Sequence, residues 1–186
     1  MKIAFRNLFC ILVFTSYVCL AQTRLPISHA LDTWITNAEK DVVSAADAMP
    51  EDKYSFAPTA GGQFAGVRTF AQQVKHLAAN NYRMAARILG QTPTPDQEFE
   101  TGPETVQSKE QIMDYVKGSF MALHQAVATT TADNALTPVM LARVRTAKQN
   151  TRVEFAVDAV AHSYDHYGQM VEYLRMNGIV PPASRK

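Results

Sequence analysis

The last long segment of the chain, residues 151–178, reads TRVEFAVDAVAHSYDHYGQMVEYLRMNG. It has the features of a complete amphipathic helix. Thr151 and Glu154 have the spacing of a capping box, which satisfies backbone N–H groups at a helix start. Gly178, followed by two prolines, is typical of a helix end. A helix of this length must bury its apolar side against other elements, so this segment predicts a helical protein.

Three further segments repeat apolar residues at spacings of three and four, the periodicity of helices. They span 28–48, 66–89 and 108–131. The third opens with a second capping box, formed by Ser108 and Gln111. Residues 139–148 can add a short helix. No segment alternates with period two for long enough to form a strand, so the sequence predicts an all-α four-helix bundle.

Residues 1–21 have the pattern of a secretory signal peptide. Lys2 and Arg6 form a positive start, an apolar run follows, and the small residue Ala21 precedes the expected cleavage site. The run is too short for a permanent membrane span, which needs about 20 apolar residues. We therefore expect an exported protein, periplasmic or extracellular, with one bundle domain over 22–186.

Cys10 and Cys19 are the two cysteines of the chain, and both lie in this leading segment. The mature domain would therefore have no thiol for a disulfide, a nucleophile or a metal ligand. Lipid attachment to Cys19 is the alternative to ordinary cleavage, although Val18 is bulky for the position before a lipidated cysteine. Cleavage lowers the formal charge from +1 to about −1. No basic field remains, which argues against nucleic acid as a partner.

His162 and His166 are four residues apart on one helix, so both imidazoles point the same way and can close on one metal ion. They share a face with Phe155 and Ala159, which places them toward the bundle interior. A metal ion would satisfy one nitrogen of each ring, and the other nitrogen then needs an acceptor. We expect Asp158 to orient His162. The alternative is a pair that only forms hydrogen bonds in a polar layer of the core.

Three further histidines lie on the other predicted helices. His76, at the edge of the apolar stripe of 66–89, is either a boundary residue or a ligand. His124 is either a boundary residue or a fourth ligand. His29 lies near the start of the first helix, where a surface position is expected. Spacing alone does not decide which of them completes a site with the pair on the last helix.

Three stretches of the chain resemble the DinB family, in the same order as in that family. They are 48–59 (AMPEDKYSFAPT), 70–82 (FAQQVKHLAANNY) and 162–182 (HSYDHYGQMVEYLRMNGIVPP). The first resembles the loop after the family's first helix. The second resembles its second helix with the first metal histidine, and the third resembles its last helix and tail. The resemblance covers essentially the whole mature chain.

This resemblance implies a DinB/YfiT-like bundle with up-down-down-up connectivity, in which the loop 91–107 crosses between two parallel helices. It also implies a divalent-metal site made by His76, His162 and His166, and three ligands leave open positions for water, as in catalytic sites. Imidazole suits zinc, nickel, iron and copper alike, and we expect zinc or nickel. Some members of the fold are thiol-dependent transferases or isomerases. Small reduced thiols are scarce outside the cytosol, which argues against that reaction in an exported protein.

Three functions are consistent with the sequence. The first is a metal-dependent enzyme acting on a small-molecule substrate, hydrolase-like in preference to a thiol-dependent transferase. The second is a non-catalytic metal-binding or stress-response bundle, in which the ion mainly rigidifies the fold and His124 completes its coordination. The third is a metal-free bundle that acts through its surfaces or as a homodimer.

Overall fold

The computed structural model describes residues 24–59, 65–95, 100–139 and 151–185. Four long helices form this part of the chain: α1 (Ile27–Ala48), α2 (Phe70–Ile88), α4 (Lys109–Ala128) and α5 (Arg152–Met176). Two short 3-10 helices accompany them, η1 (Glu51–Lys53) and η3 (Pro182–Ser184). The fold is thus the all-α four-helix architecture that the sequence predicts. The predicted signal peptide lies outside the described residues, as does the short helix expected over 139–148, apart from its first residue.

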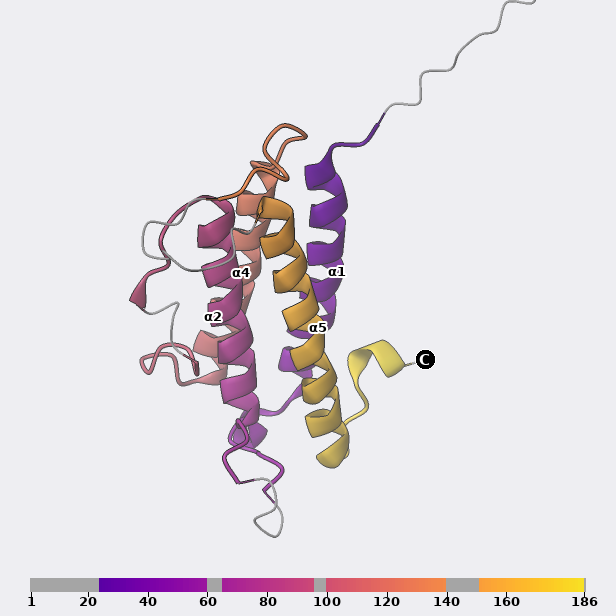
Figure 1. Cartoon of the computed structure of the whole chain (residues 1–186). Helices are drawn as coiled ribbons and strands as arrows, with labels where there is room; N and C mark the ends of the chain where they lie inside the picture. Colours follow the sequence, from indigo (N-terminus) through magenta and orange to yellow (C-terminus); the bar gives the residue numbers. More distant parts are fainter. Residues whose placement is uncertain (1–23, 60–64, 96–99, 140–150, 186) are drawn as a thin grey trace, which may run out of the picture.

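The four helices run up, down, down and up, as the resemblance implies. Figure 1 shows that α1 and α5 begin at the same end of the bundle. Lys109, at the start of α4, donates to the carbonyl of Met49 beyond the end of α1, at 2.9 Å, so α1 and α4 are antiparallel. Tyr173, near the end of α5, donates to the carbonyl of Arg68 before α2, at 2.9 Å, so these two helices are also antiparallel. Consequently α2 and α4 are parallel, and a long connection must cross between them.

The packing of the helices leaves two diagonal pairs. Both α1 and α2 pack against α4 and α5, whereas α1 and α2 occupy opposite corners, and α4 and α5 barely touch.

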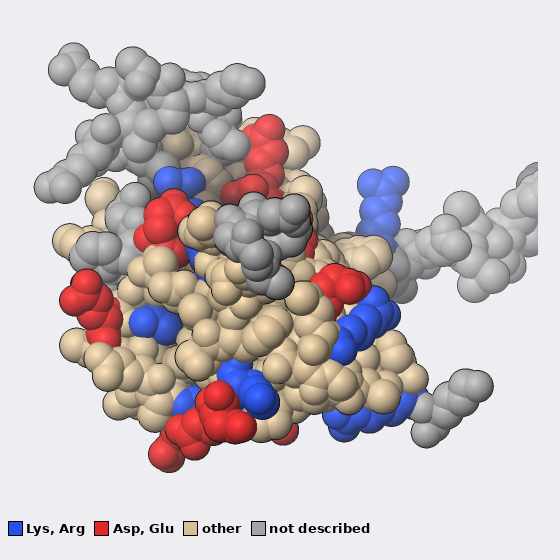
Figure 2. Space-filling view, turned by 90° about the horizontal axis from the view of Figure 1, so that it is seen from below, with Lys and Arg blue, Asp and Glu red and all other residues tan. Residues whose placement is uncertain are grey.

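No helix in the described part of the chain is both long and apolar enough to cross a membrane. Figure 2 shows Lys and Arg side chains interspersed with Asp and Glu on the end of the bundle seen from below. Among the described residues on that face, charges of both signs alternate.

Side-chain caps determine where three of the helices begin. The capping boxes predicted at Ser108 and Thr151 both form. A third box, between Thr69 and Gln72, starts α2 at Phe70, one helical turn later than the apolar spacing predicts. Thr69 has an extended backbone (φ −67°, ψ 166°) and accepts from the N–H of Gln72, so the residues before it cannot continue the helix.

The carbonyl groups at the end of α1 accept hydrogen bonds from side chains outside the helix. A helix leaves its last carbonyl groups without internal partners. Lys109 Nζ donates to the carbonyls of Asp47 and Met49, at 2.7 and 2.9 Å. The Tyr54 hydroxyl, in the following loop, donates to the carbonyl of Ala46 at 2.8 Å. These bonds tie the first loop and the start of α4 to the end of α1.

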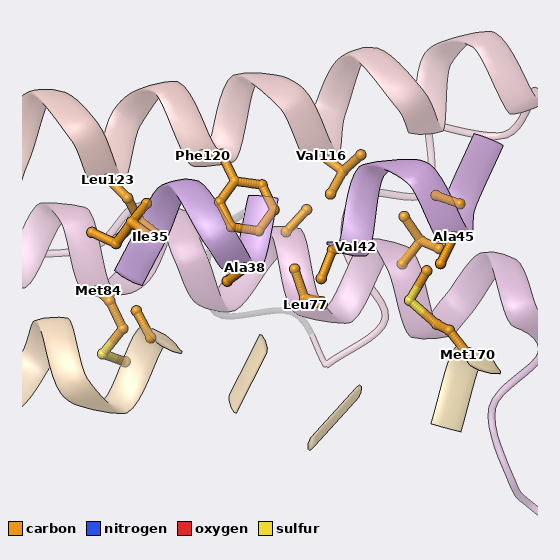
Figure 3. Packing of buried hydrophobic residues seen from close by; sticks show 14 of the residues in the cluster. Ile35, Ala38, Val42, Ala45, Leu77, Met84, Val116, Phe120, Leu123 and Met170 are labelled. Atoms are coloured by element: carbon orange, nitrogen blue, oxygen red, sulfur yellow. The ribbon is translucent and has the colours of Figure 1, made fainter. Parts of the chain in front are cut away.

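The core lies along the bundle axis, where apolar stripes from all four helices meet. Figure 3 shows that its labelled members come from every helix, and all of them are buried: Ile35, Ala38, Val42, Ala45, Leu77, Met84, Val116, Phe120, Leu123 and Met170. Full burial of one large apolar side chain contributes about 1.5–3 kcal/mol. The apolar residues whose spacing predicts the first three helices are buried, except for Leu31 and Tyr115, which remain partly exposed. The buried ones are Ile35, Ala38, Val42, Ala45, Phe70, Val74, Leu77, Met84, Ile88, Ile112, Phe120, Leu123 and Val127. The apolar periodicity therefore identified the core faces of these helices.

We expect Thr69→Ala to lower the free energy of unfolding by about 1 kcal/mol, because the N–H of Gln72 loses its capping acceptor. Urea unfolding followed by circular dichroism measures this. Thr33→Ala is the matched control, since Thr33 is exposed inside α1 and bonds only to the carbonyl of His29. That control should change stability by less than about 0.5 kcal/mol. Equal effects of the two substitutions would contradict the capping role.

Candidate metal centre

Three histidines converge between α2 and α5. His76 comes from α2, while His162 and His166 come from successive turns of α5. Nε2 of His162 lies 3.1 Å from Nε2 of His76 and 3.2 Å from Nε2 of His166. The same nitrogen of each ring therefore faces a common point. In the part of the chain that the structure describes, these are the residues whose ligand atoms gather closely enough to hold a metal ion.

Oxygen acceptors orient two of the three rings from outside. Nδ1 of His76 lies 2.5 Å from the backbone carbonyl oxygen of Glu100, and Nδ1 of His166 lies 2.7 Å from Oε1 of Gln73. The Gln73 amide donates to Gln169 at 2.7 Å, which turns its oxygen toward the imidazole. A carbonyl oxygen can only accept, so both Nδ1 atoms carry the proton. Both Nε2 atoms therefore present lone pairs to the common point.

The third ring has no such acceptor. Nδ1 of His162 is buried and has no hydrogen-bond partner among the described residues. The expectation that Asp158 orients this ring is therefore wrong. Asp158 lies on an exposed side of α5, where its carboxylate keeps its hydration.

The donor set fits a divalent transition metal. Two nitrogens at about 2.0–2.1 Å from one zinc ion, at a tetrahedral angle, lie about 3.3 Å apart. The observed separations of 3.1 and 3.2 Å are close to this value. Protons alone cannot satisfy the arrangement, because His76 and His166 both offer lone pairs there. Only His162 could donate, so at most one of the two contacts could be a hydrogen bond, whereas an ion accepts all three lone pairs.

Burial keeps the three rings neutral at physiological pH. It lowers the pKa of His162 to about 3, and the neighbouring His166 and His76 act in the same direction. It lowers the pKa of His166 to about 4, again with help from His76. The pKa of His76 is also lowered, first by burial and then by the charge of Arg68. Neutral imidazole is the form that binds metal, so few protons need to be displaced on binding.

His124 does not join this cluster. Its Nδ1 lies 2.5 Å from Oδ1 of Asp32, and its Nε2 lies 3.1 Å from Oε2 of Glu39, so both nitrogens are engaged by α1. Burial alone would lower the pKa of His124, but the hydrogen bonds and charges of the two carboxylates outweigh it and raise the pKa. The structure thus assigns His124 to the contact between α1 and α4. His29 is exposed, as expected.

The crossing connection between α2 and α4 supplies the outer partner of His76. Glu100 holds Nδ1 of His76 with its backbone carbonyl, and its side chain forms a 2.7 Å ion pair with Arg68. Gly102 lies against α2 with φ +67°, and a Cβ there would meet Lys75 Cβ at 2.9 Å and the Lys75 carbonyl oxygen at 3.1 Å. No pattern in the sequence points to Glu100. Gln73 could have been found, because it precedes His76 by one turn on the same face.

Comparisons with known proteins agree with this architecture. The family model described as the DinB superfamily matches residues 35–170. Among solved structures, a DinB-like protein from Bacillus cereus ATCC 10987 superposes with a TM-score of 0.62, over 84% of this chain and 96% of that chain. The two sequences are 18% identical, so this likeness concerns the fold alone. No curated protein sequence matches the chain.

We expect the metal-free protein to lose stability as the pH falls from about 6.5 toward 4. Unfolded histidines titrate near pH 6.5, whereas the pKa is about 3 for His162 and about 4 for His166 in the folded state. Between these values the unfolded chain binds more protons, so acid favours unfolding. Urea unfolding of chelator-treated protein at several pH values measures the slope. His162→Gln/His166→Gln should flatten it, and an unchanged slope would contradict the assignment.

We expect Gly102→Ala to be more destabilising than Gly178→Ala. Both glycines have positive φ, at +67° and +73°, but a Cβ at Gly178 meets nothing within 4 Å. The control therefore measures the backbone cost alone, about 1–2 kcal/mol. Gly102→Ala adds the clash with Lys75 and shifts the segment that carries Glu100. Metal affinity, measured by competition with a chromogenic chelator, should fall about tenfold in Gly102→Ala only. Equal affinities would contradict a role of this segment in orienting His76.

Proposed function

The chain belongs to the DinB superfamily, and from this premise we propose that it is a metal-dependent enzyme, hydrolase-like, with a mononuclear three-histidine site. The observation that carries the proposal is the convergence of three Nε2 atoms, with separations of 3.1 and 3.2 Å. Three protein ligands leave coordination positions for water and substrate, which is the pattern of catalytic rather than structural zinc sites. We propose His76, His162 and His166 as the ligands, and zinc or nickel as the ion.

A bound divalent ion would supply Lewis-acid chemistry, by polarising a substrate oxygen or acidifying a water molecule. The protein's own groups prepare the site for it. The Glu100 carbonyl and the Gln73 amide hold two imidazoles in the required tautomer. Burial keeps the rings neutral, so the ligands do not offset the charge of the ion. An ion whose charge is not offset by its ligands is a stronger Lewis acid, and this favours hydrolysis.

The position of His124 favours an open site over the non-catalytic alternative. That alternative needs a fourth protein ligand to complete the coordination, and His124 was the candidate. Both of its nitrogens bond to carboxylates on α1. We also propose that the chain is exported, and this location favours hydrolysis over thiol transfer, because reduced small thiols are scarce outside the cytosol.

We expect protein purified without a histidine tag to contain about one divalent ion per chain, bound by three imidazoles. Elemental analysis by mass spectrometry measures the amount and names the ion. His162→Ala should lose the ion, because two imidazoles hold it too weakly. His124→Ala is the matched control and should retain it. Loss of metal in both variants, or in neither, would contradict the proposed ligand set.

The cobalt-substituted protein tests whether the site is open. Electron–nuclear double resonance in deuterated water should detect at least one exchangeable water ligand. A site without exchangeable water would contradict the enzymatic proposal and favour the non-catalytic metal-binding bundle.

A further inference from the structure

A polar row on α2 continues from the metal centre toward the end of the helix. Asn80 and Arg83 follow His76 by one and two turns, so the three residues lie on one face of α2. Arg83 donates Nη2 to Oδ1 of Asn80 at 2.5 Å. After burial and the neighbouring groups, the charge of Arg83 is among the causes that lower the pKa of His76 and of His162. The guanidinium is therefore close enough to act on both rings.

This row contains buried N–H donors without acceptors. Among the described residues, neither Nδ2 of Asn80 nor Nε of Arg83 has a hydrogen-bond partner, although both atoms are buried. Asn80 is only 2% exposed. A buried donor without an acceptor costs about 1–3 kcal/mol, so such atoms are rare in folded proteins. Nδ1 of His162, across on α5, is a third unpartnered atom of the same region.

The charges around the row are also unbalanced. Arg68, the other cation that acts on the histidines, is paired with Glu100 at 2.7 Å. Arg83 has no carboxylate partner in the described part of the chain. Three neutral imidazoles would not offset the charge of a divalent ion. The carboxylate of Glu100, 3.5 Å from Nδ1 of His76, is already paired with Arg68. With an ion bound, the metal centre and Arg83 would therefore carry positive charge that the described carboxylates nearby do not fully offset.

We propose that Arg83 and Asn80 form an oxyanion-binding subsite, so that the substrate of the metal centre is a small molecule bearing a carboxylate or phosphate group. An oxyanion offers several acceptor lone pairs at short range and can accept from the guanidinium Nε and the amide Nδ2 together. It would satisfy both buried donors and neutralise Arg83. The identification of this anion as part of the substrate rests on the proposed function, whereas the subsite itself does not require the metal.

Calorimetric titration with acetate and with inorganic phosphate, at constant ionic strength, tests the subsite on the full-length mature chain. Each titration is done with metal-loaded and with chelator-treated protein. We expect Arg83→Gln to weaken binding of the preferred anion about tenfold to a hundredfold in both forms, as expected for the loss of a charged hydrogen bond. The preferred anion distinguishes a carboxylate from a phosphate. Asn80→Ala should weaken binding less than Arg83→Gln.

Arg175→Gln is the matched control, because Arg175 is an exposed arginine paired with Glu172 near the end of α5. It should leave anion binding unchanged. Arg83→Lys should retain part of the affinity, which separates loss of charge from misfolding. The subsite is overturned if neither anion binds, or if Arg83→Gln binds as tightly as the parent protein. If Arg83-dependent binding persists in a chain that takes up no metal, the proposed function fails while the subsite stands.

Discussion

Nε2 of His162 lies little more than 3 Å from Nε2 of both His76 and His166, an arrangement that protons cannot fully satisfy. The Glu100 carbonyl and the Gln73 amide oxygen accept hydrogen bonds from Nδ1 of His76 and of His166. Nε2 of each of these two rings therefore carries a lone pair. The remaining ring, His162, could donate to only one of its two neighbours. This conflict between α2 and α5 is the constraint from which the metal-binding interpretation follows, while burial of the same rings is the main cause of their low pKa values.

The connectivity of the bundle contributes directly to the site. Because α2 and α4 are parallel, the chain has to return along the length of α2 before α4 can begin. On its way it brings Glu100 to the outer side of His76 and pairs it with Arg68. A bundle in which the same helices were joined by a tight hairpin would have no segment in this position. The parallel arrangement of α2 and α4 therefore also determines how the His76 imidazole is oriented.

Local signals in the sequence predicted most of the fold. Capping boxes at Ser108 and Thr151 and the apolar stripes located the helices, because these features depend on residues close together in the chain. The start of α2 was missed although Thr69 and Gln72 carry the same pattern. The histidine pair on α5 was visible from spacing, whereas His76 entered through the family resemblance. The partners of His124 and the outer acceptor of His76 depend on contacts between distant segments, which spacing does not reveal.

The proposed ligands come from two of the four helices, and His76 and His162 are 86 residues apart in the sequence. Residues 24–186 contain no cysteine. An ion held by both helices would act as a cross-link, closing a loop of this size in any state that retains it. By analogy with a disulfide around a loop of similar length, such a closure reduces the entropy of the unfolded chain by an amount worth about 4–5 kcal/mol at room temperature. The same ion would then serve both as a reactive centre and as a cross-link between α2 and α5.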